Sequence, residues 1–360
     1  MERFSCKTEI LAGAGAISHL ADFKAKRLFL VTDPFFQKNG TARHIAQAAK
    51  AEAVEIFDQV SPDPTVELAA AGTARVKAFG PDLIVALGGG SAMDCAKALG
   101  YFGGGNYKFA AIPTTSGSGS EVTDFAILTH NGVKHPLVDE KLRPDMAILD
   151  PELLQELPKG LIADSGFDVL AHALEACCAK NSGSFSDSLA RDAFRMAFAA
   201  LPRSYAGDKS VRLTMHKAAS MAGLAFSQAG LGLCHALAHA LGGAVHVPHG
   251  RLNAILLPAV LECNAPAAQK KYASMARAAG FSASSDVMAL RAMKNGLIQL
   301  RRALNLPETL AQAGVDTGQL RKQEQQIIEA ALADPCCLTN PIKPEANMCR
   351  TILHQVMGRG

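Results

Sequence analysis

The sequence predicts a protein of two domains, an α/β domain over residues 1–150 with a parallel sheet and an all-helical domain over residues 151–360. A length of 360 residues suggests about two domains. The first 150 residues alternate short apolar runs with helical stretches, which is typical of parallel βαβ units. After residue 150 the chain is rich in Ala and Leu at helical spacing and has few β-branched runs.

The elements of the first domain can be justified in order along the chain. Short apolar runs predict strands at residues 27–33, 54–60, 82–90 and 109–115. Apolar residues at helical spacing predict helices at residues 41–53, 66–79 and 91–99. The segments 126–130 and 134–139 predict an added hairpin after the fourth strand.

Composition narrows the range of function classes. Hydrophobic residues make up 49% and charged residues 19%, which excludes intrinsic disorder. The net charge is only +3, so we expect neither a nucleic-acid partner nor a membrane surface. Nine cysteines are an odd, scattered set, which predicts reduced thiols in a cytoplasmic protein. The first ten residues carry charges and no apolar core, so we expect no secretory signal.

Two glycine-rich segments must be told apart. Residues 88–91, Gly-Gly-Gly-Ser, follow an apolar strand and open a helix, where backbone N–H groups and the helix dipole favour a dinucleotide pyrophosphate. An ordinary strand–helix turn is the alternative. Residues 13–18, GAGAIS, superficially resemble a nucleotide-binding motif, but no apolar strand of proper length precedes them. We interpret this second segment as a turn before a helix.

Polar residues at two strand ends indicate further ligand contacts. Asp33 closes the first strong strand, where an acidic residue can accept hydrogen bonds from an adenosine ribose and repel a 2′-phosphate. It can equally cap the helix that would begin at Pro34, and the spacing leaves both roles open. Residues 112–121, after the fourth strand, form a loop rich in Ser, Thr and Gly that could donate many hydrogen bonds to a ligand.

Paired histidines in the second half predict a metal site. Asp168 and His172 lie four residues apart, as do His235 and His239, so each pair shares one face of a helix. His249 follows in a segment broken by proline and glycine. A carboxylate with several imidazoles suits a divalent metal such as Fe²⁺ or Zn²⁺, although a single histidine of this kind would more often be an ordinary core residue.

The segment 218–250 contains no Asp, Glu, Lys or Arg and is long enough to span a bilayer. It holds four histidines, however, which a membrane span would place in hydrocarbon. We therefore interpret it as buried helix that lines a site.

Five motifs together resemble the iron-dependent (group III) alcohol dehydrogenase family. They are GGGSAMDCAK, IPTTSGSGSEVT, LRPDMAILDPEL, GFDVLAHALEA and GLCHALAHALGGAVHVPHG, in this order. The matching segments run from about Phe4 to the C-terminal TNP segment. The segments SPDPT and AGLAFSQAGLGLCHALAH are most similar to the 1-propanol dehydrogenase branch that is linked to bacterial microcompartments.

The resemblance implies a role for individual residues. The implied metal ligands are Asp168, His172, His235 and His249. His239 corresponds to a catalytic histidine near the nicotinamide and substrate that is not a ligand, and Phe226 to an aromatic of the substrate pocket. The implied cofactor contacts are Asp33, Gly88, Gly89, Gly90, Ser91, Asp94, Thr114, Thr115, Ser118 and Lys134.

The resemblance also implies fold, cofactors and activity. It implies a Rossmann-like NAD-binding domain, an all-α metal-binding domain, and NAD with Fe²⁺, or with Zn²⁺ instead, as cofactors. The implied reaction interconverts short-chain primary alcohols and aldehydes, such as 1-propanol and propanal, by hydride transfer. The implied protein is a cytoplasmic homodimer, with a bacterial microcompartment as a candidate location.

Three other functions remain open at this point. One is a glycerol- or butanol-type dehydrogenase of the same superfamily. Another is a dehydroquinate synthase-like lyase, although such an enzyme needs a cluster of Lys and Arg for a phosphorylated substrate, and the charge-free segment 218–250 argues against it. The third is a non-catalytic protein with a relic site.

Overall fold

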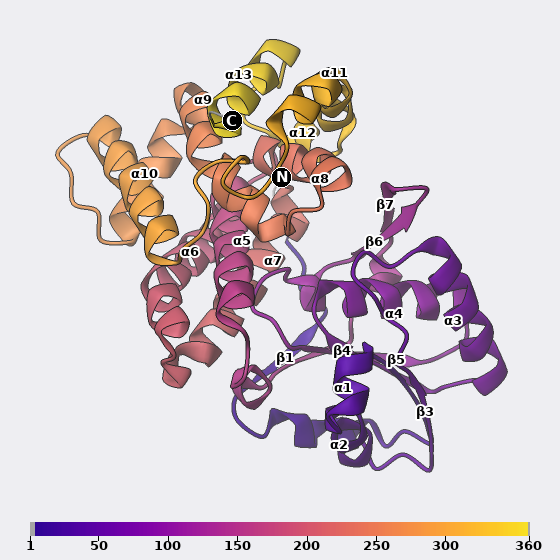
Figure 1. Ribbon diagram of the computed structural model, residues 1–360. Coiled ribbons are helices and arrows are strands. Elements are labelled where there is room, and N and C mark those ends of the chain that lie inside the picture. The colour runs from indigo at the N-terminus through magenta and orange to yellow at the C-terminus, as the bar shows by residue number, and fades with distance from the viewer. Residues whose placement is uncertain (1–3, 359–360) are drawn as a thin grey trace. The chain divides into compact units, whose positions relative to one another are not determined.

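The computed structural model describes residues 4–358 and divides the chain into two compact units. One unit is Ser5–Leu157, and the other begins at Pro158 and also takes in Phe4. The division lies somewhat beyond the boundary predicted after residue 150. Figure 1 shows strands in the first unit and helices throughout the second, and we describe each unit by itself.

The first unit is built on a six-stranded parallel sheet of order β1-β8-β5-β4-β2-β3. Its strands are β1 (Glu9–Ala12), β2 (Arg27–Val31), β3 (Ala53–Phe57), β4 (Leu83–Gly88), β5 (Lys108–Pro113) and β8 (Met146–Leu149). The connecting helices are a 3₁₀ segment (Ala16–Phe23), α1 (Pro34–Lys38), α2 (Thr41–Ala48), α3 (Val66–Phe79) and α4 (Gly90–Gly103). An antiparallel hairpin, β6 (Phe125–His130) with β7 (Val133–Val138), stands outside this sheet.

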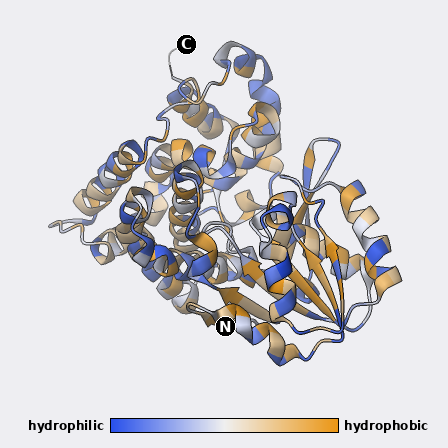
Figure 2. Cartoon of the chain, turned by 60° about the horizontal axis from the view of Figure 1, so that its bottom comes forward, coloured by the Kyte–Doolittle hydropathy of each residue, from blue (hydrophilic) through white to orange (hydrophobic). Residues whose placement is uncertain are grey.

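Both faces of the sheet are buried, which explains the nearly continuous apolar runs of its central strands. Leu28 and Leu30 of β2 belong to a core that includes residues of α2, whereas Phe29 and Val31 face a second core that includes residues of α3 and α4. Figure 2 shows the strands of the sheet as predominantly hydrophobic. The carboxyl ends of β2, β4 and β5 meet at one edge of this sheet.

The sequence predicted the four central strands, the intervening helices and the hairpin, with shifts of a few residues at their ends. The edge strand β1 and the short strand β8 were not predicted. The helix expected at residues 41–53 ends at Ala48, and Lys50 then adopts a left-handed conformation with φ of 54°. The GAGAIS segment is the predicted turn before a helix, with Gly15 at φ of 74° and a 3₁₀ segment after it.

The regular elements described from Pro158 onward are all helices. They are α5 (Lys159–Cys178), α6 (Ser184–Ala206), a 3₁₀ turn (Lys209–Val211), α7 (Arg212–Ala229), α8 (Leu233–Val245), α9 (His249–Ala278), α10 (Asp286–Ala303), α11 (Thr317–Ala333), α12 (Cys336–Thr339) and α13 (Ala346–Met357). Helix α5 packs against α6, α7 and α9, and α8 packs against α9 and α11.

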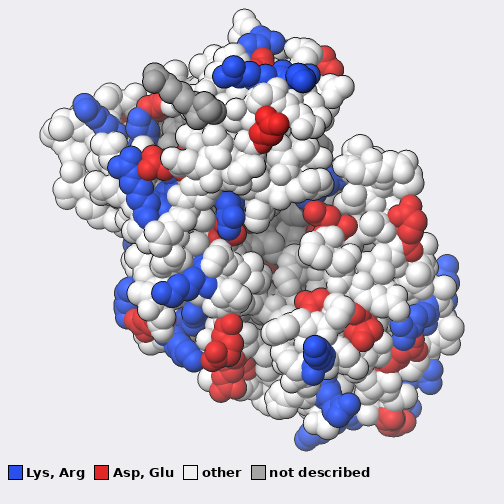
Figure 3. All heavy atoms as spheres, viewed as in Figure 1, with Lys and Arg blue, Asp and Glu red and all other residues white. Residues whose placement is uncertain are grey.

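Within residues 4–358, no single helix is both long and apolar enough to cross a membrane. One pair, Lys209–Ala229 with Leu233–Val245, reaches that length and composition only together and is bent by 102°. Basic and acidic groups lie interspersed on the face shown in Figure 3. All nine cysteines are free thiols.

Candidate metal centre and nucleotide loop

Helix α5 carries polar side chains in a position where they need partners. It is buried along most of its length, and its buried residues include Asp164, Asp168, His172 and Glu175. Asp168, His172 and Glu175 are spaced at i, i+4 and i+7, so they share one face of the helix. Because a buried polar group without a partner is costly, this face must be satisfied by other elements or by a ligand.

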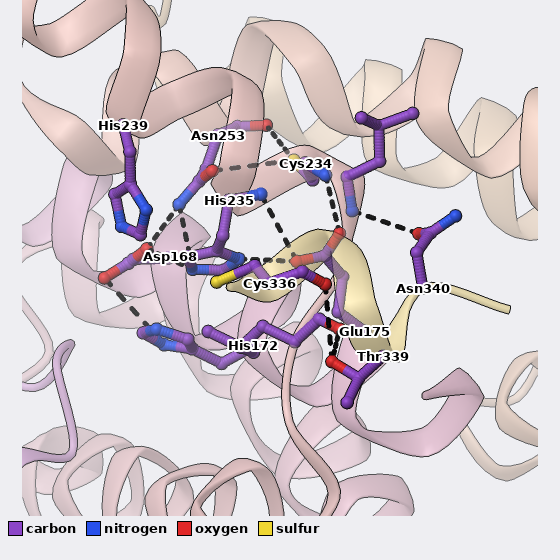
Figure 4. Close-up of polar contacts among 12 residues, drawn as sticks. Asp168, His172, Glu175, Cys234, His235, His239, Asn253, Cys336, Thr339 and Asn340 are labelled. Atoms are coloured by element: carbon purple, nitrogen blue, oxygen red, sulfur yellow. Dashed lines mark hydrogen bonds and ion pairs between the residues drawn. The ribbon is translucent and has the colours of Figure 1, made fainter. Parts of the chain in front are cut away.

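Helices α8 and α9 supply the partners of this polar face. His235 Nε2 and His249 Nε2 each lie 3.6 Å from Asp168 Oδ1, and His172 Nδ1 lies 3.8 Å from Asp168 Oδ2. Gly250 makes the approach of α9 feasible, because a Cβ there would lie 2.1 Å from the carbonyl oxygen of Asp164. Figure 4 shows Asp168, His172 and His235 pointing toward one another.

The donor atoms of this group converge in the way a divalent cation requires. The carboxylate of Asp168 and ring nitrogens of His172 and His235 all lie within 4.8 Å of one another. The amide Nδ2 of Asn253 lies 2.7 Å from Asp168 Oδ1 and 3.2 Å from both His235 Nε2 and His249 Nε2. His172 Nδ1 is buried and has no hydrogen-bond partner. Three imidazoles and a carboxylate with a spare buried nitrogen fit Fe²⁺ or Zn²⁺.

Electrostatics around this group also favour a bound cation. Burial lowers the pKa of His172 to about 4, which leaves one ring nitrogen with a free lone pair near neutral pH. Burial alone would raise the pKa of Asp168, but the neighbouring His172, His249 and His235 hold it well below its usual range. Burial likewise opposes the charged form of His235, yet hydrogen bonds and charges of Asp168 and Glu175 raise its pKa to about 9. Two buried carboxylates therefore demand positive charge at this position.

His249 forms the open side of the group, and two other predicted site residues lie beside it. The side chain of His249 is 32% exposed, whereas those of Asp168 and His235 are buried, so the group is open on the side of His249. His239 stacks on His249 with ring centroids 5.1 Å apart, and its Nδ1 lies 2.8 Å from Asp334 Oδ2. Phe226 of α7 is buried and stacks on His172 at 4.5 Å.

Glu175 connects two of these helices. Its carboxylate accepts hydrogen bonds from the backbone N–H groups of Cys234 and His235, and its Oε2 lies 2.6 Å from His235 Nδ1. Helix α8 has no side-chain cap of its own, because its N-cap residue is Gly232. Glu175 therefore caps α8 from another helix and also holds a proton of His235 on Nδ1, so Nε2 is the ring nitrogen that exchanges its proton for a metal ion.

A Glu175→Gln variant should bind its metal roughly 10- to 100-fold more weakly, the usual cost of losing an outer partner of a metal-binding histidine. An amide has one acceptor oxygen and cannot replace both carboxylate oxygens. Competition with a chelator measures this affinity, and Glu329→Gln, at an exposed position of α11, is the matched control. A variant with unchanged affinity would show that Glu175 only caps the helix.

In the other unit, the predicted nucleotide loop brings three strand ends together. Gly88 has φ of 149°, and a Cβ there would clash with Ala92 at 2.6 Å and lie 3.9 Å from Asp33 Oδ2. A Cβ on Gly89 would lie 3.3 Å from Thr115 Oγ1, and one on Gly90 would lie 3.2 Å from Ser118 Cβ. The backbone N–H of Thr114 donates to the Gly88 carbonyl at 2.9 Å. Most of the predicted cofactor residues, including Ser91 at the start of α4, are thus neighbours.

Asp33 performs the capping role that the sequence left open. Its Oδ1 accepts hydrogen bonds from Phe35 N at 2.9 Å and Phe36 N at 3.2 Å, at the start of α1. Its Oδ2 faces Gly88. The structural role of Asp33 is therefore confirmed, and its role toward a ribose stays a prediction.

Two other predicted cofactor residues have their polar contacts with residues outside the glycine loop. Asp94 is buried, accepts a hydrogen bond from Ser120 Oγ at 2.8 Å and one from Ile127 N at 3.2 Å, and burial raises its pKa. Lys134 lies on β7, where its Nζ pairs with Asp63 at 2.8 Å. Their cofactor contacts stay predictions.

The structure adds five residues that the sequence analysis did not single out. Glu175 and Asn253 could have been found, because they lie at helical spacing from His172 and His249, respectively. Lys97 of α4 is buried and donates to Ser120 Oγ, to Phe125 O and to both oxygens of Thr123, while burial lowers its pKa to about 8. Asp334 and Cys336 reach the site from the C-terminal segment, and no local pattern marks them.

Comparison with known proteins agrees with this geometry. The family description "Iron-containing alcohol dehydrogenase" matches residues 7–151, and "Fe-containing alcohol dehydrogenase family, C-terminal" matches residues 162–357. The chain is 38% identical to the 1-propanol dehydrogenase PduQ of Salmonella typhimurium over 99% of this chain and 100% of that protein. It is 34% identical to an NADPH-dependent butanol dehydrogenase of Clostridium saccharobutylicum over 95% and 94% of the two chains.

A solved structure supports the fold. The sulfoacetaldehyde reductase of Bifidobacterium kashiwanohense in complex with NAD⁺ superimposes with a TM-score of 0.90, at 26% identity over 99% of this chain and 98% of that one. The two family matches together span nearly all of the described residues, and the similarity to PduQ extends over 99% of this chain. The chain therefore belongs to the iron-containing alcohol dehydrogenase family of oxidoreductases.

Proposed function

We propose that the protein interconverts short-chain primary alcohols and aldehydes, such as 1-propanol and propanal, by NAD-linked hydride transfer. The observation that carries the proposal is the convergence of Asp168, His172 and His235 on one buried point, with His249 at its open side. The similarity to a 1-propanol dehydrogenase over the full length supports the substrate class. When bound, the metal supplies Lewis acidity toward the substrate oxygen, and NAD supplies the hydride chemistry.

The chain itself contributes a group for proton exchange. Nδ1 of His239 is held by Asp334, so Nε2 is the ring nitrogen left to take the hydroxyl proton of an alcohol or to return it. Burial opposes the charge of Asp334, but the hydrogen bonds from His239 and from the Cys336 N–H lower its pKa to about 2. Asp334 is therefore charged near neutral pH and acts as a positioning residue for His239.

The test is a panel of aldehydes and alcohols assayed against NAD(H) and NADP(H) after loading with Fe²⁺ or with Zn²⁺. Propanal with NADH should be among the best pairs, and butanal belongs in the panel because a butanol dehydrogenase is also similar. Absence of turnover on every short-chain aldehyde with either metal would refute the proposal. Preference for glycerol would assign the chain to the polyol-oxidising branch instead.

Assembly and location belong to the same proposal. The similarity to PduQ supports a short-chain alcohol as the partner molecule. From the family resemblance of the sequence motifs we also propose a cytoplasmic homodimer, with a microcompartment as a candidate location. Light scattering of the purified protein and co-fractionation with shell proteins test these two points separately.

Coenzyme choice gives a prediction at Asp33. An Asp33→Asn variant keeps an oxygen that can cap α1 but removes the negative charge beside the glycine loop. Repulsion of a 2′-phosphate by a partly buried carboxylate costs a few kcal/mol, so the ratio of kcat/KM for NAD over NADP should fall by roughly 10-fold or more.

The companion variant Asp33→Gly separates the two roles of the carboxylate. It should shift the same ratio while also lowering the Tm slightly, since glycine replaces an N-cap residue at a cost of a few tenths of a kcal/mol. The wild-type protein should prefer NAD. An unchanged coenzyme ratio in both variants would leave capping as the only role of Asp33.

A further inference from the structure

A second group of metal-binding side chains lies beside the first. It consists of His239 on α8, Asp334 between α11 and α12, and Cys336 at the start of α12, with one ligand atom of each residue lying within 4.8 Å of the other two. We propose that these three residues form a second divalent-metal site, selective for Zn²⁺, whose occupation inhibits the enzyme.

The donor set distinguishes the two sites. The first offers only nitrogen and oxygen ligands, which suit Fe²⁺ as well as Zn²⁺. The second site adds a thiol, and zinc in proteins is bound by Cys, His and carboxylate side chains. Because sulfur is a soft ligand, the thiol favours zinc over a hard ion. His239 and Asp334 are also 20% and 15% exposed, so an ion can reach them from solvent and a water can complete four ligands.

The second site is held in place by the rest of the C-terminal segment. Asp334 Oδ1 accepts the backbone N–H of Cys336 at 2.8 Å, while Oδ2 lies 2.8 Å from His239 Nδ1. Thr339 Oγ1 donates to Leu231 O at 2.6 Å, and Asn340 Oδ1 accepts a hydrogen bond from Leu233 N at 3.0 Å, just before and at the start of α8. Figure 4 shows Cys336, Thr339 and Asn340 on this segment. The segment that carries Asp334 and Cys336 is thus fastened to the helix that carries His239.

Zinc binding has a defined chemical balance. The Cys336 thiol releases its proton to solvent as the Sγ–Zn bond forms. The proton that His239 Nδ1 donates to Asp334 moves to Nε2 of the same ring, and an Nδ1–Zn bond takes the place of that hydrogen bond. The negative charges of the Cys336 thiolate and the Asp334 carboxylate balance the charge of the ion. A ring held by zinc cannot exchange a proton with substrate, so the inhibitory consequence rests on the role proposed above for His239.

The binding test uses a thiolate signal that the first site cannot give. Protein holding one equivalent of its metal is titrated with Co²⁺, a spectroscopic substitute for Zn²⁺, and thiolate-to-metal charge-transfer absorption in the near ultraviolet is recorded. We expect a second equivalent to bind with this absorption. Cys336→Ser should lose the absorption, and Cys337→Ser should keep it, since the Cys337 thiol donates to Ala331 O instead.

Two results would overturn the site. One is that the protein binds no metal beyond the first equivalent and shows no charge-transfer absorption. The other is that the charge-transfer absorption persists in Cys336→Ser. Neither depends on turnover, so failure of the site is distinct from failure of the proposed reaction.

Inhibition is measured on the Fe²⁺-loaded enzyme with surplus Zn²⁺. Relative to its own uninhibited rate, Cys336→Ser should need at least roughly 10-fold more Zn²⁺ for half inhibition, while Cys337→Ser should behave as wild type. Equal sensitivity of the two variants would refute the inhibitory role even if the second ion binds.

Discussion

A His249→Ala variant is expected to lose its metal and all measurable turnover while still binding NADH. His249 Nε2 lies 3.6 Å from Asp168 Oδ1 on the open side of the group. Loss of a ligand should weaken metal binding by more than the roughly 10- to 100-fold that an outer partner costs. NADH binding should survive because the glycine loop belongs to the unit Ser5–Leu157, whereas the ligands belong to the other unit.

Metal analysis, turnover and NADH fluorescence on the same preparation check this expectation. The side chain of His249 is 32% exposed, so its removal should disturb folding less than removal of the buried Asp168. Asp168→Ala is the companion variant and should give the same loss, with a larger drop in Tm because its carboxylate faces three imidazoles. Full activity of a metal-depleted His249→Ala protein would refute the ligand assignment.

A His239→Ala variant should keep the first metal and lose turnover by roughly 10²-fold, the usual contribution of a general acid–base group. The ring lies beside the metal group but is bound by Asp334 through Nδ1, which directs it toward proton transfer. Turnover per bound ion is measured with one equivalent of Fe²⁺. The turnover of Asp334→Asn should lie between those of this variant and the wild type, because an amide oxygen can still accept the Nδ1–H hydrogen bond but lacks the charge of the carboxylate.

Loss of metal from His239→Ala with unchanged turnover per ion would instead make His239 a ligand, and the assignment of Asp168, His172, His235 and His249 as the four ligands would need revision.

The parts of the fold that the sequence predicted are those with a local signal. The strands β2, β4 and β5 are buried on both faces, so each is a continuous apolar run. β1 was not predicted because its four residues, Glu9–Ala12, are half-exposed at the sheet edge and lack such a run. β8 is equally short, and it was not predicted because it lies next to residue 150, where the composition of the chain changes.

The site divides in the same way. Asp168 with His172 and His235 with His239 could be found because a helical turn brings residues four apart onto one face. Asp334 lies 95 residues after His239 and meets it only through tertiary packing, so no pattern in the sequence connects them. Cys336 also reaches the site only through tertiary packing. The sequence does not distinguish it from Cys337, whose thiol donates to the Ala331 carbonyl instead.

The double use of Glu175 has a consequence for how this half of the molecule is assembled. The first N–H groups of α8 are satisfied by a side chain 59 residues earlier in the chain, and Leu233 N by Asn340 from far beyond it. An isolated α8 peptide would leave those groups to water and, at 13 residues, would be a marginal helix. We therefore expect the histidine-bearing helix to be stable only once α5 and the segment around Asn340 pack against it, so a nascent chain should lack the metal site until Asn340 has left the ribosome.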